Sequence, residues 1–107
     1  MNAKFQKFTG SNSQYYFRLK AANGETILTS ESYLSDFSRN NGIEAVKINA
    51  PYDVRYKRLI SVRNEPYFTL HASNGQVIGV SEMYSSTTVR DNGIEVVKKV
   101  APTALVE

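Results

Sequence analysis

The side chains best suited to binding chemistry are aromatic and basic residues that alternate along one short segment. In "YYFRLK", Tyr16, Arg18 and Lys20 occupy every second position. A period of two places such residues on one face of a β-strand. Aromatic rings beside cationic groups can stack on bases and neutralise phosphates, as in proteins that bind single-stranded nucleic acid. The alternation therefore predicts a candidate binding surface on a sheet.

A related pattern recurs in the second half of the chain, in "YFTLH" and in the preceding basic stretch "RYKR". The candidate binding surface comprises Tyr16, Arg18, Lys20, Arg55, Lys57, Arg58, Tyr67 and His71. Three interpretations stay open. The residues could be an ordinary solvent-facing sheet surface, a seam for self-association or a protein partner, or a weak site for single-stranded nucleic acid or another anionic ligand.

Carboxylates also recur, at Glu44 in "NGIEAVK" and at Glu95 in "NGIEVVK". Two such groups could perform acid–base chemistry if they converged in a pocket. Each is followed three residues later by a lysine, however, at Lys47 and Lys98. This is the spacing of a helix-surface ion pair, which stabilises a helix by about 0.2–0.5 kcal/mol. We therefore expect surface ion pairs rather than a catalytic pair.

Other recurring polar residues also have structural interpretations. Ser30-Glu31 and Ser81-Glu82 are expected to cap a helix or to form a turn. Arg39 and Arg90 are expected to be exposed or ion-paired helix residues rather than an anion site. His71 is the only histidine, so a histidine-based metal cluster or a Ser-His-Asp set in both halves is unavailable. The sequence predicts a non-enzymatic protein with no catalytic site, no metal site and no cofactor.

Composition narrows the class of protein further. The chain has 107 residues, a net charge of +3, a pI near 9.2 and no cysteine. The charge permits contact with anionic partners but falls short of the dense basic patches typical of nucleic-acid-binding proteins. The absence of cysteine excludes disulfides and thiol nucleophiles. Because no run of 18 apolar residues occurs, we predict a cytoplasmic protein without a membrane span.

The chain is a tandem repeat. Shifting the sequence by 51 residues aligns residues 5–51 with residues 56–102, with 20 identities in 47 positions and no gap. A unit of this size is at the lower limit for an independent core. We therefore expect residues 1–107 to form a single domain in which the two repeats share one core and are related by a pseudo-two-fold axis.

Each repeat reads as three strands, a helix and a final strand. Period-two alternation and the Asn23-Gly24 and Asn74-Gly75 turns predict the hairpins. Ser35 and Ser86 are expected helix N-caps. The predicted strands are Lys4–Phe8, Tyr15–Lys20, Thr26–Thr29 and Pro51–Val54 in the first repeat, and Arg55–Ile60, Tyr67–His71, Val77–Val80 and Thr103–Val106 in the second. The predicted helices are Asp36–Asn49 and Thr87–Val100.

The resulting fold class is α+β, with two tandem β-β-β-α-β repeats sharing one largely antiparallel sheet and two helices packed on one face. The helices should cover the face that bears Phe17, Leu19, Phe68 and Leu70. Gly42 and Gly93 interrupt the helical patterns, and we expect each to permit close packing of the helix against the sheet.

Each repeat contains two characteristic segments, "FRLKAANGETILTSESY" and "GIEAVKINAP" in the first repeat, and "YFTLHASNGQVIGVSEMY" and "GIEVVKKVAP" in the second. These segments resemble the repeat of the YegP-like family of small bacterial proteins. The resemblance covers nearly the whole chain. It implies a pair of β(3)-α-β units in a single sheet with the last strands exchanged between units. It implies no catalytic site, because the family is one of unknown function. We therefore expect a binding or interaction module whose partner is unknown.

Overall fold

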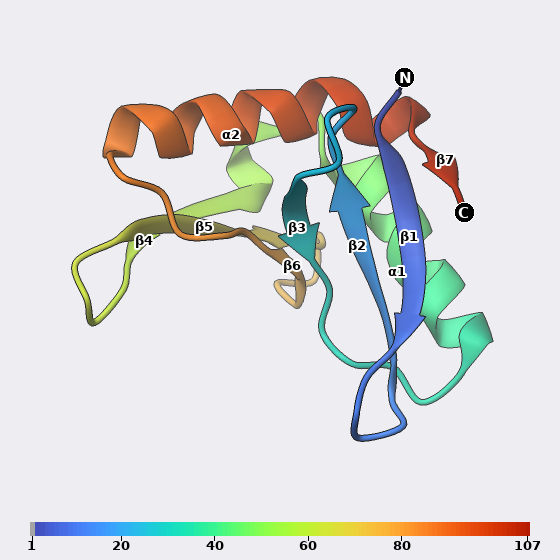
Figure 1. Ribbon diagram of the computed structural model, residues 1–107. Coiled ribbons are helices and arrows are strands. Elements are labelled where there is room, and N and C mark those ends of the chain that lie inside the picture. Colours follow the sequence, from blue (N-terminus) through green and yellow to red (C-terminus); the bar gives the residue numbers. More distant parts are fainter. Residues whose placement is uncertain (1) are drawn as a thin grey trace.

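The computed structural model describes residues 2–107, and its strands belong to one seven-stranded sheet covered by two α-helices (Figure 1). The first repeat contributes β1 (Lys4–Thr9), β2 (Tyr15–Lys20), β3 (Thr26–Thr29) and α1 (Asp36–Asn49). The second contributes β4 (Tyr56–Ile60), β5 (Pro66–His71), β6 (Val77–Val80), α2 (Thr87–Val100) and β7 (Leu105–Val106). Short 3-10 turns, η1 (Asp53–Arg55) and η2 (Ala101–Thr103), follow the two helical regions.

The sheet order β4-β5-β6-β3-β2-β1-β7 places the third strand of each repeat at the centre. There β3 pairs with β6 in an antiparallel register that sets Thr29 opposite Val80. These residues are 51 positions apart and therefore occupy equivalent places in the two repeats. The predicted pseudo-two-fold axis thus passes between β3 and β6. The two halves of the sheet also twist strongly relative to each other, as Figure 1 shows.

Both helices begin where a serine caps them. The Ser35 side chain accepts a hydrogen bond from the Ser38 backbone N–H, and the Ser86 side chain accepts one from the Val89 N–H. These bonds satisfy backbone donors that have no partner within the first helical turn. The predicted N-caps and helix limits are confirmed in both repeats.

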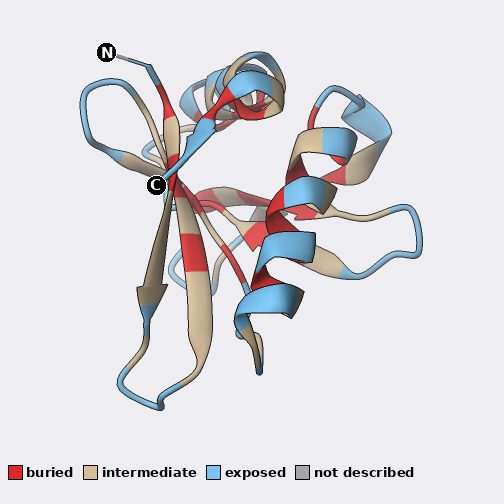
Figure 2. Ribbon diagram, turned by 90° about the vertical axis from the view of Figure 1, so that its right-hand side faces the viewer, coloured by how far each residue is buried: buried red, intermediate tan, exposed pale blue. Residues whose placement is uncertain are grey.

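The core lies between the helices and one face of the sheet. Figure 2 shows that the buried residues of the helices face the strands, whereas their exposed residues face outward. One hydrophobic cluster contains residues from both repeats, and its fully buried members include Phe17, Leu19, Val46, Phe68, Leu70, Ile94 and Val97. The predicted covered face is therefore confirmed. That residues 1–107 form a single domain with a shared core stays a prediction.

The helix glycines allow a close approach, as expected, but the neighbour is a tyrosine side chain. A Cβ atom on Gly93 would lie 2.5 Å from the Tyr84 hydroxyl oxygen, and one on Gly42 would overlap the Tyr33 hydroxyl. Each tyrosine ring in turn stacks on a core phenylalanine of its own repeat. The glycines therefore make room for a tyrosine wedged between helix and sheet.

The predicted final strand of the first repeat, Pro51–Val54, is wrong. Residues of this segment instead lead into η1, which runs directly into β4. In the second repeat, β7 lies parallel to β1 and sets Leu105 opposite Lys4. The equivalent pairing in the first repeat would set Val54 opposite Arg55, its own neighbour in the chain. Covalent connection therefore forbids it, and only the last strand of the second repeat is exchanged.

The hairpin turns contain a smaller difference from expectation. Gly24 and Gly75 have a φ of +88°, as predicted for the left-handed position. Asn23 and Asn74 do not adopt positive φ. Their side chains instead accept hydrogen bonds from the backbone N–H groups of Glu25 and Gln76. Asparagine therefore stabilises these turns through its side chain.

Candidate binding surface on the outer sheet face

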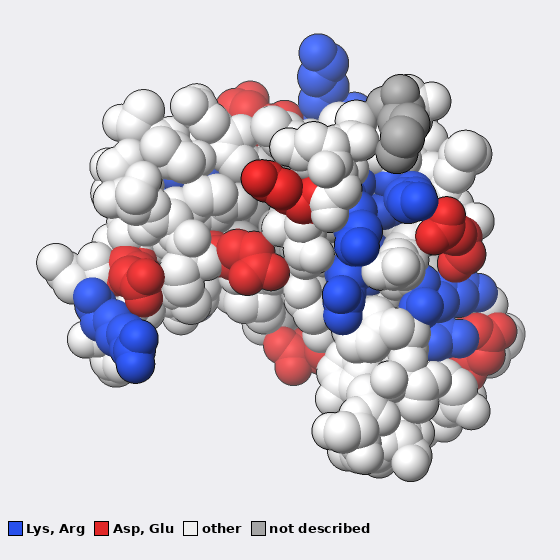
Figure 3. All heavy atoms as spheres, in the orientation of Figure 1, with Lys and Arg blue, Asp and Glu red and all other residues white. Residues whose placement is uncertain are grey.

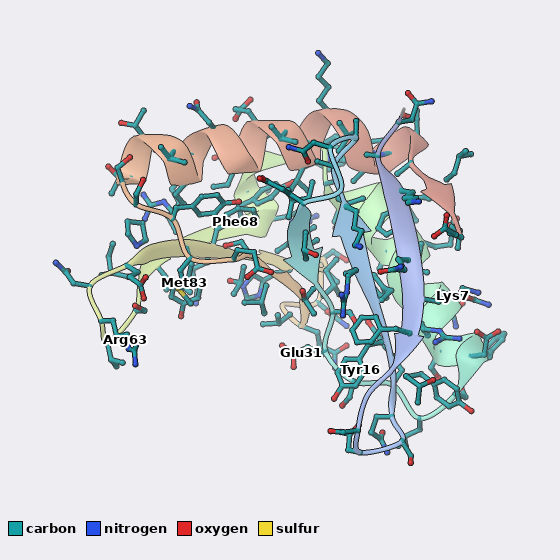
Figure 4. All side chains as sticks on the ribbon, in the orientation of Figure 1. Lys7, Tyr16, Glu31, Arg63, Phe68 and Met83 are labelled. Carbon is teal, nitrogen blue, oxygen red and sulfur yellow. The ribbon has the colours of Figure 1, made fainter. Side chains whose placement is uncertain are left out.

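Strand β2 directs its candidate residues away from the helices. Phe17 and Leu19 are completely buried, so Tyr16, Arg18 and Lys20, which alternate with them, lie on the outer face. Figure 4 shows Tyr16 on this side of the ribbon. The alternation in the sequence predicts this face for all three side chains, and the structure agrees.

Arg55 and Arg58, by contrast, lie on the helix side. Arg55 belongs to η1, and its Nε donates a hydrogen bond to Oδ1 of Asn49 at the end of α1, at 2.9 Å. Arg58 forms ion pairs with Asp53 at 3.0 Å and with Asp91 of α2 at 3.3 Å. The inclusion of both arginines in an outer surface is therefore wrong. Tyr56 begins β4 with its ring in the core, so Arg58, two residues later, faces the same way.

Lys57, Tyr67 and His71 do lie on the outer face but far from the basic side chains of β2. Strands β6 and β3 separate β5 from β2. At about 4.8 Å per strand, β5 lies roughly 14 Å from β2 and β4 about 19 Å from it. The predicted residues therefore do not form one continuous patch.

His71 serves the hairpin between β5 and β6. Its Nδ1 lies 3.0 Å from the Gly75 carbonyl oxygen, and its Nε2 lies 2.8 Å from Oγ1 of Thr69. Because a carbonyl can only accept, Nδ1 carries a proton, and in the neutral ring Nε2 accepts from the threonine hydroxyl. Both ring nitrogens are thus engaged within the hairpin, which favours a structural role.

The structure adds Lys4 and Phe8 to the surface, two residues absent from the sequence-based set. The β1–β2 register sets Phe8 opposite Tyr16 and Lys4 opposite Lys20. Phe5 is completely buried, so the residues of β1 that alternate with it, including Lys4 and Phe8, face outward. The signal was present in "KFQKF", where the same period of two places Lys4 and Phe8 opposite to Phe5.

A compact stack of three side chains covers part of this face. The Phe8 and Tyr16 rings are stacked with centroids 5.4 Å apart and an interplanar angle of 13°. The guanidinium carbon of Arg18 lies 3.9 Å from the centre of the Phe8 ring. Asn12 donates a hydrogen bond to the Tyr16 hydroxyl at 3.0 Å. The Phe8 ring is thus covered by Tyr16 and by Arg18, so it positions the guanidinium and leaves little ring surface for stacking on a ligand.

Two of the three basic groups around this stack, Arg18 and Lys20, lack a neutralising partner among the described residues. Within residues 2–107, Arg18 and Lys20 have no carboxylate within 4.0 Å. Lys4 pairs with Glu107 at 2.9 Å, but both side chains are partly exposed. Like charges directly opposite each other on paired strands are unfavourable. Figure 3 shows Lys and Arg spheres grouped over β1 and β2. We call Lys4, Phe8, Tyr16, Arg18 and Lys20 the Arg18 face.

The remaining recurring residues have structural roles. Glu44 lies 3.7 Å from Lys47, and Glu95 lies 2.9 Å from Lys98. The expected helix-surface ion pairs are therefore confirmed. Lys98 also bonds to Asp53 at 2.8 Å, which links α2 to the segment before β4.

Arg39 and Arg90 are ion-paired, but they are buried rather than exposed, with 8% exposed area each. Arg39 donates to the Phe8 carbonyl at 3.2 Å, and Arg90 donates to the equivalent Leu59 carbonyl at 3.3 Å. Each arginine thus fastens the first turn of a helix to an outer hairpin of the sheet. The alternative of an exposed helix residue is wrong.

Ser30 and Ser81 do not cap a helix. The Ser30 hydroxyl accepts a hydrogen bond from the Phe17 N–H and donates one to the Glu31 carbonyl. Ser81 repeats this arrangement with Phe68 and Glu82. The serines therefore continue the contact between neighbouring strands, and the expected turn does not form at either position.

Two further properties concern membranes and metals. Along residues 2–107, none of the helices combines the length and apolar character that crossing a bilayer requires. The same residues bring no three His, Cys, Asp or Glu side chains together in a metal-binding group.

Two solved structures share this fold across the whole chain. The solution NMR structure of a UPF0339 protein from Shewanella oneidensis has a TM-score of 0.92 and 45% identity, with 91% of that chain covered. The solution NMR structure of the protein of unknown function yegP from E. coli has a TM-score of 0.93 and 41% identity, with 92% of that chain covered. The chain is thus similar to both in sequence and in fold.

Sequence relatives lead to the same family. The UPF0339 protein YegP of Yersinia pestis is 54% identical over 88 residues, which cover 82% of this chain and 79% of the relative. A UPF0339 protein of Shewanella oneidensis is 45% identical over 107 residues, which cover 100% of this chain and 97% of the relative. The model of a domain of unknown function, DUF1508, matches residues 11–56 and again residues 61–107. The chain therefore belongs to the DUF1508 family, with two tandem copies of the domain, and to the group of uncharacterised UPF0339 proteins that includes YegP.

Proposed function

We propose that this protein is a non-catalytic binding module that holds a phosphate-rich, single-stranded nucleic acid on the Arg18 face. The observation that carries the proposal is the position of Lys4 directly opposite Lys20, beside Arg18. Lys4 is also paired with Glu107, so a phosphate group here would be attracted chiefly by Lys20 and Arg18. The proposed ligand is therefore recognised chiefly through its charge.

The preorganised Arg18 guanidinium supports this proposal. Its Nε is buried and has no hydrogen-bond partner among the described residues, while the group rests on the Phe8 ring. A stacked guanidinium loses little conformational freedom when it binds, and its remaining N–H groups suit the oxygens of a phosphate. Base stacking contributes less, because Phe8 already contacts both Tyr16 and Arg18.

A non-catalytic role fits the surroundings of the groups that could act as acids or bases. His71 has both ring nitrogens engaged within its hairpin. Burial, together with nearby Glu31, raises the pKa of Tyr33, which makes its hydroxyl a poor proton donor near neutral pH. A chain without cysteine needs no oxidising compartment, which is compatible with the cytoplasmic location that we propose.

The proposal is tested by fluorescence anisotropy with a labelled single-stranded oligonucleotide at several salt concentrations. With Arg18 and Lys20 contacting phosphates, the logarithm of the affinity should fall with the logarithm of salt with a slope of about −1.4. Lys20→Gln should weaken binding several-fold and make this slope less steep by about 0.7. Inorganic polyphosphate serves as competitor, because a ligand recognised only through phosphate would be displaced by it.

The matched control is Lys99→Gln. Lys99 is exposed on α2, on the helix side, and has no carboxylate within 4.0 Å among residues 2–107. Both substitutions lower the net charge equally. If Lys99→Gln weakened binding as much as Lys20→Gln, the oligonucleotide would be responding to net charge, and the Arg18 face would lose its role.

A further inference from the structure

A hollow of about 460 Å³ lies where β3 of the first repeat meets the loop that follows β6 in the second. Figure 4 shows Met83 on that loop. The lining combines acidic and apolar side chains, and no ligand has been assigned to it. We call it the Met83 hollow, and its lining includes Glu25, Ile27, Glu82, Met83, Tyr84 and Val89.

The acidic side of the Met83 hollow lacks a counter-charge. Within residues 2–107, no basic nitrogen lies within 4.0 Å of the Glu25 or Glu82 carboxylate. Burial raises the pKa of Tyr84, and the charges of Glu82 and Glu25 raise it further. Both carboxylates therefore lie close enough to Tyr84 for their negative charges to act on its hydroxyl. Two negative charges without a partner favour a cationic occupant.

The apolar side of the hollow is accessible to solvent. Met83 has 46% and Val89 has 44% of its area exposed, and both line the hollow beside Ile27. A methionine side chain adapts its shape to a partner more easily than a branched one. The aliphatic stem of a lysine buries well against such a surface while its charged end stays near polar groups. The lining therefore matches a cation carried on an apolar stem.

An equivalent hollow of about 470 Å³ exists on the other side of the pseudo-two-fold axis. Its lining contains Glu31 and Tyr33, which correspond to Glu82 and Tyr84. Gln76 stands at the position of Glu25, however, and Ser32 at the position of Met83. This second hollow has a similar size, but its lining has one carboxylate fewer, no thioether and no counterpart of Val89. It is therefore an internal control in which shape is kept and chemistry differs.

We propose that the Met83 hollow binds a lysine side chain of a partner protein, with the ammonium group between Glu25 and Glu82 and the aliphatic stem against Met83 and Val89. The site is separate from the Arg18 face and does not depend on the proposed nucleic-acid binding. Two carboxylates supply too few ligands for a dedicated calcium site, which takes six to eight oxygens. The primary ammonium group is the better match.

The test uses the full chain with 13C-labelled methionine methyl groups, because the sequence contains only two methionines. Titration with n-butylammonium should shift the Met83 methyl signal in a saturable way, whereas n-butanol, its neutral analogue, should shift it far less. Glu25→Gln and Glu82→Gln should each weaken binding by about two- to fivefold. Glu31→Gln, in the second hollow, should leave the affinity unchanged. Equal responses to the amine and the alcohol would overturn the proposal.

A gain-of-function variant provides an independent test. Ser32→Met combined with Gln76→Glu gives the second hollow the same two groups as the first. The methyl group introduced at position 32 should then respond to n-butylammonium in a saturable way, with a weaker affinity than Met83 because no counterpart of Val89 lines this hollow. Amide spectra show whether the variant is folded. A folded variant without this response, or a Met83 signal that responds to calcium ions but not to the amine, would refute ammonium recognition.

Discussion

Leu28 occupies the space that a side chain on Gly79 would need. A Cβ atom on Gly79 would lie 2.5 Å from Cδ2 of Leu28. The two residues are 51 positions apart and therefore occupy equivalent places in the two repeats. Because β3 and β6 meet at the pseudo-two-fold axis, a large side chain on one strand fills the place of its counterpart on the other. The repeats must differ here for the core to close.

Gly79→Ala should destabilise the protein by about 1–3 kcal/mol, because the new methyl group overlaps Leu28 in a closely packed region. In an unconstrained strand position the same change would be favourable, since glycine is a poor strand residue. Urea unfolding followed by circular dichroism measures the change. A gain in stability would show that Leu28 can move aside at no cost.

Leu28→Ala should cost about 2–5 kcal/mol, because it leaves a cavity in the core. Combined with Gly79→Ala, it should cost less than the sum of the two single changes, since the added methyl group partly fills the space that leucine vacates. The double-mutant cycle gives the coupling energy directly. Strict additivity would mean that the two positions are independent.

Gly93→Ala should also destabilise the protein, although alanine is favoured over glycine by about 1 kcal/mol within a helix. The reason is the short approach to the Tyr84 hydroxyl oxygen. Tyr84→Phe removes that oxygen and should recover part of the loss. Asn92→Ala, at the exposed neighbouring position of α2, is the control and should be neutral or stabilising. If both alanine variants were stabilised alike, Tyr84 would not constrain Gly93.

The sequence predicts those parts of the fold that depend on residues close together in the chain. Both helices have the predicted limits, because the serine caps and the 51-residue repeat are visible in the sequence. The prediction of a final strand in the first repeat is wrong, because that strand would have to pair with the residues that follow it directly in the chain. The constraint between Leu28 and Gly79 could not be predicted, since it arises only where the two repeats meet.

The candidate binding surface is likewise predictable only where the sequence pattern lies within one strand. Period-two alternation placed Arg18 and Lys20 correctly, because the buried Phe17 and Leu19 lie in the same strand. The prediction that the basic residues of "RYKR" share one face is wrong, because the alternation that begins at Tyr56 directs Arg58 toward the helices. The opposition of Lys4 and Lys20 required the hairpin register. Such a register is set by the length of the turn and is harder to predict than the strands themselves.

Tyr56→Phe should lower the free energy of unfolding by about 1–2 kcal/mol. The Tyr56 hydroxyl donates a hydrogen bond of 2.7 Å to the Ala50 carbonyl, which would lose its partner. Tyr52→Phe is the matched control, because Tyr52 is 57% exposed and its hydroxyl has no hydrogen bond among the described residues. Equal effects of the two changes would remove any special role for the Tyr56 hydroxyl.

The same variant should change the response to alkali. Burial raises the pKa of Tyr56 above its ordinary value of 10.0. Above that pH the unfolded chain loses the phenolic proton while the folded chain keeps it, so stability falls as pH rises. Tyr56→Phe should therefore lose stability less steeply above pH 10.0 than the unchanged protein. Parallel curves would contradict this assignment.

Asp53 should titrate at unusually low pH. Hydrogen bonds from Arg58 and Lys98 lower the pKa of its carboxyl group from 3.8 to about 2. The stabilising effect of the ionised group is complete above pH 3.8 and is lost as the pH falls through about 2. Carboxyl 13C NMR should show this midpoint, and Arg58→Gln should raise it. Arg63→Gln, outside the ion-pair cluster, should leave it unchanged, and equal shifts would argue for a general charge effect.

The two repeats should fold only together. Helix α1 contacts β5 and β6 of the second repeat, and β7 of the second repeat pairs with β1 of the first. A fragment of residues 1–51 therefore loses part of its core and is below the size that usually folds alone. A fragment of residues 52–107 should likewise be unfolded by circular dichroism.

Mixing the two fragments should restore the fold, whereas neither should pair well with itself. Two copies of the first fragment would bring Leu28 against Leu28 at the axis, and two copies of the second would leave a gap between two Gly79 positions. Only the mixed pair combines one leucine with one glycine. Sedimentation and circular dichroism at equal concentrations would show a one-to-one folded complex. A stable folded monomer from either fragment would contradict a core shared by both repeats.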